Sequence, residues 1–420
     1  MRQQHLTTFV GGLAAALTLT LMPATVSAQT EFTGQTSGGA HYRIDVPDGW
    51  TPAGGLVIWN HGFSLDPPGP VDDLGPLRDV QLAEGYAVAA SSYSQTGWAV
   101  YRSRADIRKL VKVFRRRVGN PQTIFVSGQG MGALVTAQII ERGGMPEVVG
   151  GLPISGTMAG SAVWKEGVDM RLMYDVACDN VPGAQIPGGA NGLPPVIDPL
   201  FDAAEMANRV DACLGTSTPP KDRTPQQNAW LNFFRDVTGG SRNDVVERMH
   251  YSTFGLHDLV FDPRKQNGRR GIGNRGATYA DPFIDAGITR VGPEGNAGRL
   301  ARNYTPTGRV GDVKIVSIHT DRDGLVIVEN ESEYASVVPP QNLTVGIVSE
   351  AQPSHAGFSA AETVAAWESL RAWAAGMPQP SVQDIQNTCE SLVATGAASG
   401  KCRYDPGFVI PPYRGFRQDP

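Results

Sequence analysis

The sequence lacks the features that mark several classes of protein. After its first 28 residues it contains no apolar run of the roughly 20 residues that a membrane span requires. Only four cysteines occur, and neither a CxxC nor an HExxH pattern is present, so no metal site is expected. The 36 lysines and arginines are outnumbered by 41 aspartates and glutamates, which disfavours nucleic acid as a partner. These absences argue against membrane-spanning, metal-binding and nucleic-acid-binding proteins.

The N-terminus is typical of a secretory signal peptide. Arg2 precedes an apolar stretch over about residues 9–21, and small residues close the segment at Ala28. The apolar stretch is too short to cross a membrane. Residues 1–28 are therefore interpreted as a signal peptide, and the mature chain is expected to be secreted or periplasmic.

Export makes disulfide bonds plausible for the four cysteines. The preferred pairing is local, joining Cys178 to Cys213 and Cys389 to Cys402. The 50 glycines and 31 prolines indicate many loops, while an apolar share of 41% is ordinary for a chain that buries a sizeable core. The composition thus indicates a folded protein of one large domain with insertions, or of two domains.

Apolar runs alternate with helix-like segments in the first third of the chain. Buried strands are expected at residues 55–60, 86–92, 123–127 and 150–154, and again at 313–318 and 343–348. Helices are expected at residues 77–84, 103–118, 134–142 and 360–375. Alternating strands and helices predict an α/β fold, with a mostly parallel sheet covered by helices on both faces.

The middle and the end of the chain are less regular. Residues 161–299 are rich in Gly, Pro and Asn, with helices expected only at 203–212 and 226–237, and are interpreted as a cap or lid inserted above the sheet. Residues 377–420 are expected to form an extended tail held by its cysteine pair. Four side chains could line a pocket from the cap, although a place in its core or on its surface is favoured: Trp230, Phe233, His250 and His257.

The sharpest local pattern is residues 127–133, Ser-Gly-Gln-Gly-Met-Gly-Ala, between a predicted strand and a predicted helix. It resembles the nucleophile elbow, GxSxG, of the α/β-hydrolases. In that family the central residue is a serine on a strained turn, and here it is Gly130. Because glycine adopts positive φ freely, the turn can survive while the nucleophilic oxygen is lost. The alternatives are a glycine-rich turn of another α/β protein and a nucleotide-binding loop, which lacks its acidic partner here.

A second part of the resemblance is His61-Gly62-Phe63, directly after the first predicted buried strand. It is similar to the HG loop that forms the oxyanion hole of the family. Acyl transfer builds negative charge on a carbonyl oxygen, and two backbone N–H groups stabilise that charge. The resemblance implies that these groups belong to Met131 and to Phe63 or Gly62. The alternative for His61 is a purely structural hydrogen bond.

The resemblance also implies an acid and a base. Asp323 lies in an acidic turn after a predicted strand and matches the family pattern better than Asp321. His355 follows the next predicted strand, and the order of elbow, acid and histidine is that of the α/β-hydrolases. His355 would take a proton from the nucleophile and pass it to the leaving group, while Asp323 orients the histidine ring.

The resemblance covers roughly residues 40–160 and 300–376, within a core expected at residues 29–160 and 300–376, and it implies a secreted serine esterase or lipase. Its substrate would be a small-molecule or polymeric ester, and no cofactor would be needed. Three alternatives remain open because of Gly130. The glycine is a substitution in a working hydrolase, or the chain is a non-catalytic protein that binds an ester, lactone or acyl ligand, or His355 activates water for slow direct hydrolysis. Ser127, Ser91 and Ser92 are disfavoured as replacement nucleophiles because none is at the centre of the elbow.

Overall fold

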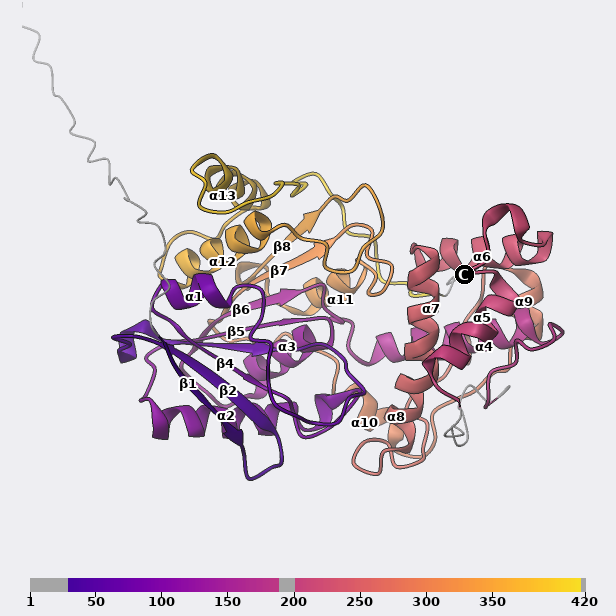
Figure 1. Cartoon of the computed structure of the whole chain (residues 1–420), viewed down its shortest axis with the longest axis horizontal. Helices are drawn as coiled ribbons and strands as arrows, with labels where there is room; N and C mark the ends of the chain where they lie inside the picture. The colour runs from indigo at the N-terminus through magenta and orange to yellow at the C-terminus, as the bar shows by residue number, and fades with distance from the viewer. Residues whose placement is uncertain (1–28, 189–200, 417–420) are drawn as a thin grey trace, which may run out of the picture.

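A computed structural model describes residues 29–188 and 201–416, so the expected signal peptide lies outside the described residues. At its centre is an eight-stranded sheet in the order β1-β2-β4-β3-β5-β6-β7-β8 (Figure 1). Strands β3 to β8 are parallel, whereas β1 and β2 are antiparallel strands at one edge. The strands are β1 (Gln29–Gln35), β2 (His41–Pro47), β3 (Leu56–Asn60), β4 (Ala87–Ser91), β5 (Ile124–Gln129), β6 (Val148–Ile154), β7 (Lys314–Thr320) and β8 (Leu343–Val348). The predicted α/β class with a mostly parallel sheet is confirmed.

The buried strands read as continuous apolar runs because helices cover both faces of the sheet. Leu56 and Ile58 of β3 pack into one apolar cluster, and Val57 and Trp59 pack into another. The first cluster includes side chains of α2 (Ser103–Arg117) and α3 (Met131–Arg142). The second includes side chains of α1 (Arg78–Ala83), α12 (Ala360–Ala374) and α13 (Val382–Ala394). Alternate residues of one strand thus anchor two helical layers.

Between β6 and β7 the chain forms a set of helices that lies beside the sheet (Figure 1). We call residues 161–302 the helical region. Its helices are α4 (Ser161–Cys178), α5 (Ala203–Leu214), α6 (Pro225–Thr238), α7 (Arg242–His250), α8 (Leu256–Phe261), α9 (Pro282–Gly287) and α10 (Ala297–Arg302). Helix α4 was not expected from the sequence. Residues 168–174 are all buried, which is about two turns of the helix and leaves no clear polar face to reveal it.

The expectation of an extended C-terminal tail is wrong, because α13 fills part of that segment. Ser381 caps the helix through a capping box with Asp384, and Ile385 and Cys389 pack against the sheet layer. After α13 the chain runs along β8, where Tyr404 pairs with Val348. Another helix that was not expected from the sequence is α11 (Asn330–Val337), which follows the loop after β7.

Both preferred disulfide pairings are confirmed. Cys178 and Cys213 join α4 to α5, and Cys389 and Cys402 join α13 to the segment beside β8. In the described part of the chain, no helix combines the length and the apolar character needed to span a membrane.

Candidate functional site

Gly130 forms the tight turn between β5 and α3. Its backbone angles, φ 56° and ψ −118°, fall in a region that residues with side chains rarely adopt. The flanking glycines are required for a different reason. A Cβ atom on Gly128 or Gly132 would clash with the backbone, in both cases with the carbonyl of Asn60. Gly128 and Gly132 therefore allow the strand, the turn and the helix to approach one another closely.

Gly130 itself has open space in front of it. A Cβ atom built on Gly130 would have a single heavy atom within 4 Å outside its chain neighbours, His355 Nε2 at 3.7 Å. A serine hydroxyl, one bond further out, would come within hydrogen-bond reach of that nitrogen. The space above the turn therefore suits a small side chain directed at His355, while the backbone conformation would be strained with any residue other than glycine.

The other ring nitrogen of His355 contacts Asp323. His355 Nδ1 lies 2.8 Å from Asp323 Oδ2, and the second oxygen of Asp323 accepts hydrogen bonds from the backbone N–H groups of Leu325 and Val326. Burial acts to raise the pKa of Asp323, but His355 and His319 outweigh it and hold the pKa well below its usual range. Asp321 is turned away and accepts the backbone N–H of Glu350. Asp323 is thus an ionised carboxylate that orients the His355 ring.

The residues expected at the oxyanion hole meet at the same place. Gly62, Phe63 and Met131 line one cavity together with Gly130 and His355. Met131 is the first residue of α3, so its N–H group has no acceptor within the helix. Two chain segments that carry the expected donors therefore border the same cavity as Gly130.

His61 shapes the loop that carries Gly62 and Phe63. Its Nδ1 lies 2.8 Å from Gly62 O, and its ring stacks on Tyr93 with the ring centroids 4.3 Å apart. Burial lowers the pKa of His61. A neutral imidazole that donates to Gly62 O satisfies this arrangement, so His61 acts here as a structural group.

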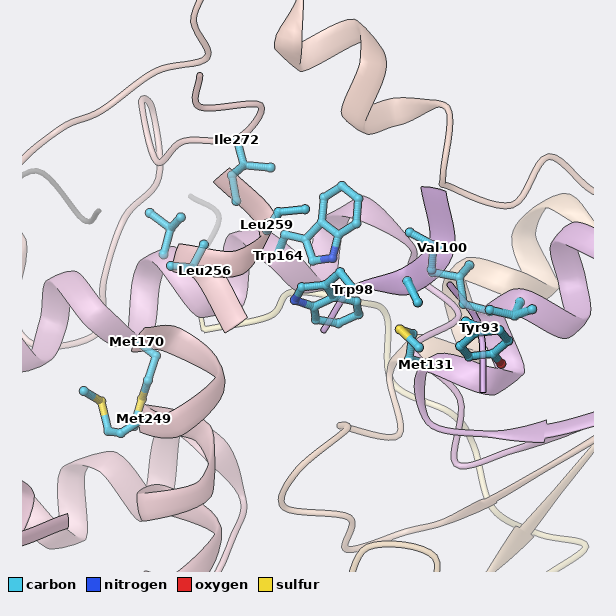
Figure 2. Close-up of a cluster of buried hydrophobic side chains, with 14 of the residues drawn as sticks. Tyr93, Trp98, Val100, Met131, Trp164, Met170, Met249, Leu256, Leu259 and Ile272 are labelled. Atoms are coloured by element: carbon cyan, nitrogen blue, oxygen red, sulfur yellow. The ribbon is translucent and has the colours of Figure 1, made fainter. Parts of the chain in front are cut away.

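The cavity has a volume of about 320 Å³, and aromatic side chains form part of its lining. Phe63 packs edge-on against Trp98, which packs edge-on against Trp164 with ring centroids 5.7 Å apart. Figure 2 shows Trp98 and Trp164 next to each other, between Met131 of the elbow and Leu256 of the helical region. The apolar core under the sheet therefore continues into the helical region through the wall of this cavity.

Sequence reasoning missed a buried charged group on this wall. Arg248 of α7 forms an ion pair with Glu166 of α4, with N–O separation 3.2 Å, and its Nε donates to the carbonyl of Gly324 beside Asp323. The C-terminal part of the chain contacts both residues. The Tyr413 hydroxyl donates to Glu166 at 2.5 Å, and Arg248 Cζ lies 4.7 Å from the centroid of the Phe416 ring. Burial raises the pKa of Glu166. No local motif could have revealed a group drawn from four separate segments.

The four candidates from the middle of the chain do not line this cavity in the described structure. Trp230 and Phe233 pack at the edge of the apolar core, His250 borders a separate hollow, and His257 packs on Phe261. The disfavoured serines Ser127, Ser91 and Ser92 do not line the cavity either. Among residues 29–188 and 201–416, no group of three or more His, Cys, Asp or Glu side chains is placed to hold a metal ion.

The sheet order, the elbow between β5 and α3, an acid after β7 and a histidine after β8 give the chain the α/β-hydrolase fold. No protein-family model and no curated protein matches the sequence.

Three solved esterase structures resemble the chain distantly. An esterase from Pyrococcus furiosus is 15% identical over 76% of this chain and 82% of its own, with a TM-score of 0.35. An esterase from Rhodococcus sp. is 14% identical over 82% of this chain and 98% of its own, with a TM-score of 0.38. The rice cell wall degrading esterase LipA from Xanthomonas oryzae is 12% identical over 87% of this chain and 90% of its own, with a TM-score of 0.37. Likenesses this distant assign neither a reaction nor a substrate to the chain.

Proposed function

We propose that the chain is a secreted carboxylic-ester hydrolase of the serine acyl-transfer type whose nucleophile position is occupied by Gly130. With glycine at this position it has little or no esterase activity. The observation that carries the proposal is the turn at Gly130, where open space faces His355 Nε2 and the backbone has the strained conformation expected of a nucleophile elbow. A site that had lost its function would not be expected to retain the open space at Gly130, the hydrogen bond between His355 and Asp323, and the loop of Gly62 together.

The proposed mechanism assigns one step to each group. With serine at position 130, His355 Nε2 takes the hydroxyl proton as the oxygen attacks the ester carbonyl. The N–H groups of Met131 and of Phe63 or Gly62 stabilise the resulting oxyanion. His355 then gives its proton to the leaving alcohol, and activated water releases the acyl group. Gly130 removes only the attacking oxygen, so binding and oxyanion stabilisation remain available.

In this proposal residues 161–299, which make up nearly all of the helical region, act as a cap over the site between core segments 29–160 and 300–376. Trp164 and Arg248 support it, because both line the cavity that contains Gly130. The segment 377–420 is an extension whose residue Phe416 also reaches the cavity. The substrate is a small-molecule or polymeric ester that enters between the cap and the sheet. Secretion is supported by the two disulfide bonds.

A second candidate function is binding of an ester, lactone or acyl ligand without turnover. The absence of an oxygen on Gly130 favours it, because a bound ester would meet the oxyanion donors and the aromatic wall but no nucleophile. Under this function the protein would hold such a ligand intact. Restoring an oxygen at position 130 separates the two functions, because only the hydrolase would then gain turnover.

Hydrolysis of short- and medium-chain p-nitrophenyl esters tests the proposal. The chain with Gly130, the variant Gly130→Ser and the control Gly130→Ala are compared after folding is verified by circular dichroism. We expect turnover with an initial burst only in Gly130→Ser, and its loss when His355→Ala is added. A folded Gly130→Ser that hydrolyses none of the esters, while the Gly130 chain binds them, would favour the binding function instead.

A further inference from the structure

A second histidine lies behind the proposed catalytic acid. His319 stands near the end of β7, and its side chain, like those of Asp323 and Glu331, has no exposed surface. Its Nε2 lies 2.8 Å from Val326 O and 3.5 Å from Asp323 Oδ2, the same oxygen that contacts His355. Its Nδ1 lies 3.1 Å from Glu331 Oε1 on α11, which also accepts the hydroxyl of Ser317.

The hydrogen-bond partners fix the number of protons on this ring. A neutral imidazole has one N–H group and one nitrogen with a lone pair. Both nitrogens of His319 face oxygen atoms, a carbonyl and a carboxylate on one side and a carboxylate on the other. A lone pair directed at either of these acceptors would be repelled. The arrangement is satisfied when both nitrogens carry hydrogen, which makes His319 a cation between two buried carboxylates.

The electrostatics of the surroundings agree with the geometry. Burial acts to lower the pKa of His319, but the hydrogen bonds and charges of Asp323 and Glu331 outweigh it and raise the pKa to about 10. A few charged or titratable groups surround the shared carboxylate from the other packed segments. They are His355 and Glu350 after β8, and Tyr251 in the helical region.

We propose that His319 is a permanently protonated positioning residue that, held by Glu331, keeps the Asp323 carboxylate ionised and turned toward His355. The inference rests on the proposed function of Asp323 and His355. The cation also withdraws part of the negative charge that Asp323 presents to His355. Removing His319 should therefore change the pH dependence of the proposed reaction.

His61 provides an internal comparison for this assignment. Burial lowers the pKa of His61, although the backbone carbonyls of Ser92 and Gly62 act to raise it, and no carboxylate is hydrogen-bonded to its ring in the described structure. His61 is therefore expected to be neutral at pH 7. One protein thus contains a histidine that burial keeps neutral and a histidine that two carboxylates keep charged.

The charge on His319 can be measured without any catalysis, in the chain that carries Gly130. Nitrogen-15 NMR of the labelled imidazoles, with signals assigned through His319→Gln and His61→Gln, reports the protons on each ring nitrogen. We expect two protonated nitrogens on His319 from about pH 5 to about pH 9, and a single one on His61 at pH 7. A neutral His319 at pH 7 would overturn the proposal.

The effect on catalysis is measured in the Gly130→Ser background through the pH profile of kcat/KM. His319→Gln removes the cation, so Asp323 stabilises protonated His355 more strongly, and the acid limb is expected to move to higher pH by on the order of one unit. The double variant His319→Gln/Glu331→Gln avoids leaving a buried carboxylate unpaired and should shift the limb less, in the same direction. A uniform loss of activity with an unmoved limb would overturn the positioning role.

The two experiments separate the two proposals. If Gly130→Ser is inert while the NMR spectra show a charged His319, the esterase function fails and the protonation of His319 stands. If Gly130→Ser is active and His319 is neutral, the esterase function stands and the inference about His319 fails.

Discussion

The loops at the C-terminal ends of the parallel strands and the helical region contribute to the same cavity in different ways. Gly130, Asp323 and His355 each follow the C-terminal end of a parallel strand, so short loops on a rigid scaffold hold them. From the helical region, Trp164 and Arg248 reach the cavity from helices that are held by packing, by the Arg248–Glu166 ion pair and by a disulfide bond. Separate parts of the chain therefore provide the reactive groups and the shape of the site, so substitutions can test the two contributions independently.

The largest loss of activity is expected from substitutions in the loops that follow the parallel strands. In the Gly130→Ser background, Asp323→Asn should lower kcat by roughly 10⁴-fold, because the His355 ring loses its orienting carboxylate. Asp321→Asn is the matched control, since Asp321 lies in the same loop but binds the backbone of Glu350 instead. Steady-state hydrolysis of p-nitrophenyl esters measures both. Equal losses of kcat in the two variants would mean that the integrity of the loop determines activity, and not the contact of the Asp323 carboxylate with His355.

Substitutions in the helical region should lower the stability of the protein more than they change its chemistry. Arg248→Met leaves Glu166 buried without its ion partner, so the free energy of unfolding should fall by about 3–5 kcal/mol. Arg290→Met is the control, because the pair of Arg290 with Asp285 is partly exposed and should cost only about 0–1 kcal/mol. Urea denaturation followed by circular dichroism measures the difference. Similar losses would show that the buried pair does not hold the helical region in place.

Each region also has its own disulfide bond. The chain-entropy relation gives about 4 kcal/mol for Cys178–Cys213, with a sequence separation of 35, and about 3 kcal/mol for Cys389–Cys402, with a separation of 13. Paired replacement of each bond by serines should therefore destabilise the helical region slightly more than the C-terminal segment. Thermal unfolding of the two double variants measures this difference. A larger loss on removing the Cys389–Cys402 bond would contradict the ranking.

The smallest effect is expected at the elbow itself. Gly130→Ser places a side chain at φ 56°, which should cost about 1–3 kcal/mol in the free energy of unfolding. Gly132→Ser should cost more, because its Cβ would clash with the carbonyl of Asn60 in addition to any strain. Denaturation of the two variants side by side tests the comparison. A larger loss for Gly130→Ser would mean that the site does not accommodate a nucleophile.

The sheet could be predicted from the sequence because its strands are buried apolar runs that end in recognisable turns. The parallel strands β3 to β8 were expected, whereas β1 and β2 were not, since β1 is largely exposed and β2 precedes the first clear pattern. The motifs at Gly130, Asp323 and His355 are local, and each follows one of the predicted strands. Their spatial convergence follows from the order of the strands in a parallel sheet.

The rest of the site depends on contacts between distant segments. Arg248 and Glu166 are separated by 82 residues, and each alone reads as a charge on an ordinary helix. His319 lies in a segment singled out for Asp323, but its role depends on Glu331, which belongs to a helix that was not expected from the sequence. Pairings of this kind have no local signal, so they become visible only once the chain is folded.

Covalent labelling with a fluorophosphonate probe tests the central claim most directly, because the reagent reports an activated nucleophile whatever the natural substrate is. Folded Gly130→Ser should gain one adduct per chain, located at position 130 by mass spectrometry, and His355→Ala should suppress it. The chain with Gly130 should remain unlabelled. An adduct on Ser127, Ser91 or Ser92 in the Gly130 chain, or a folded Gly130→Ser that stays unlabelled, would contradict the account.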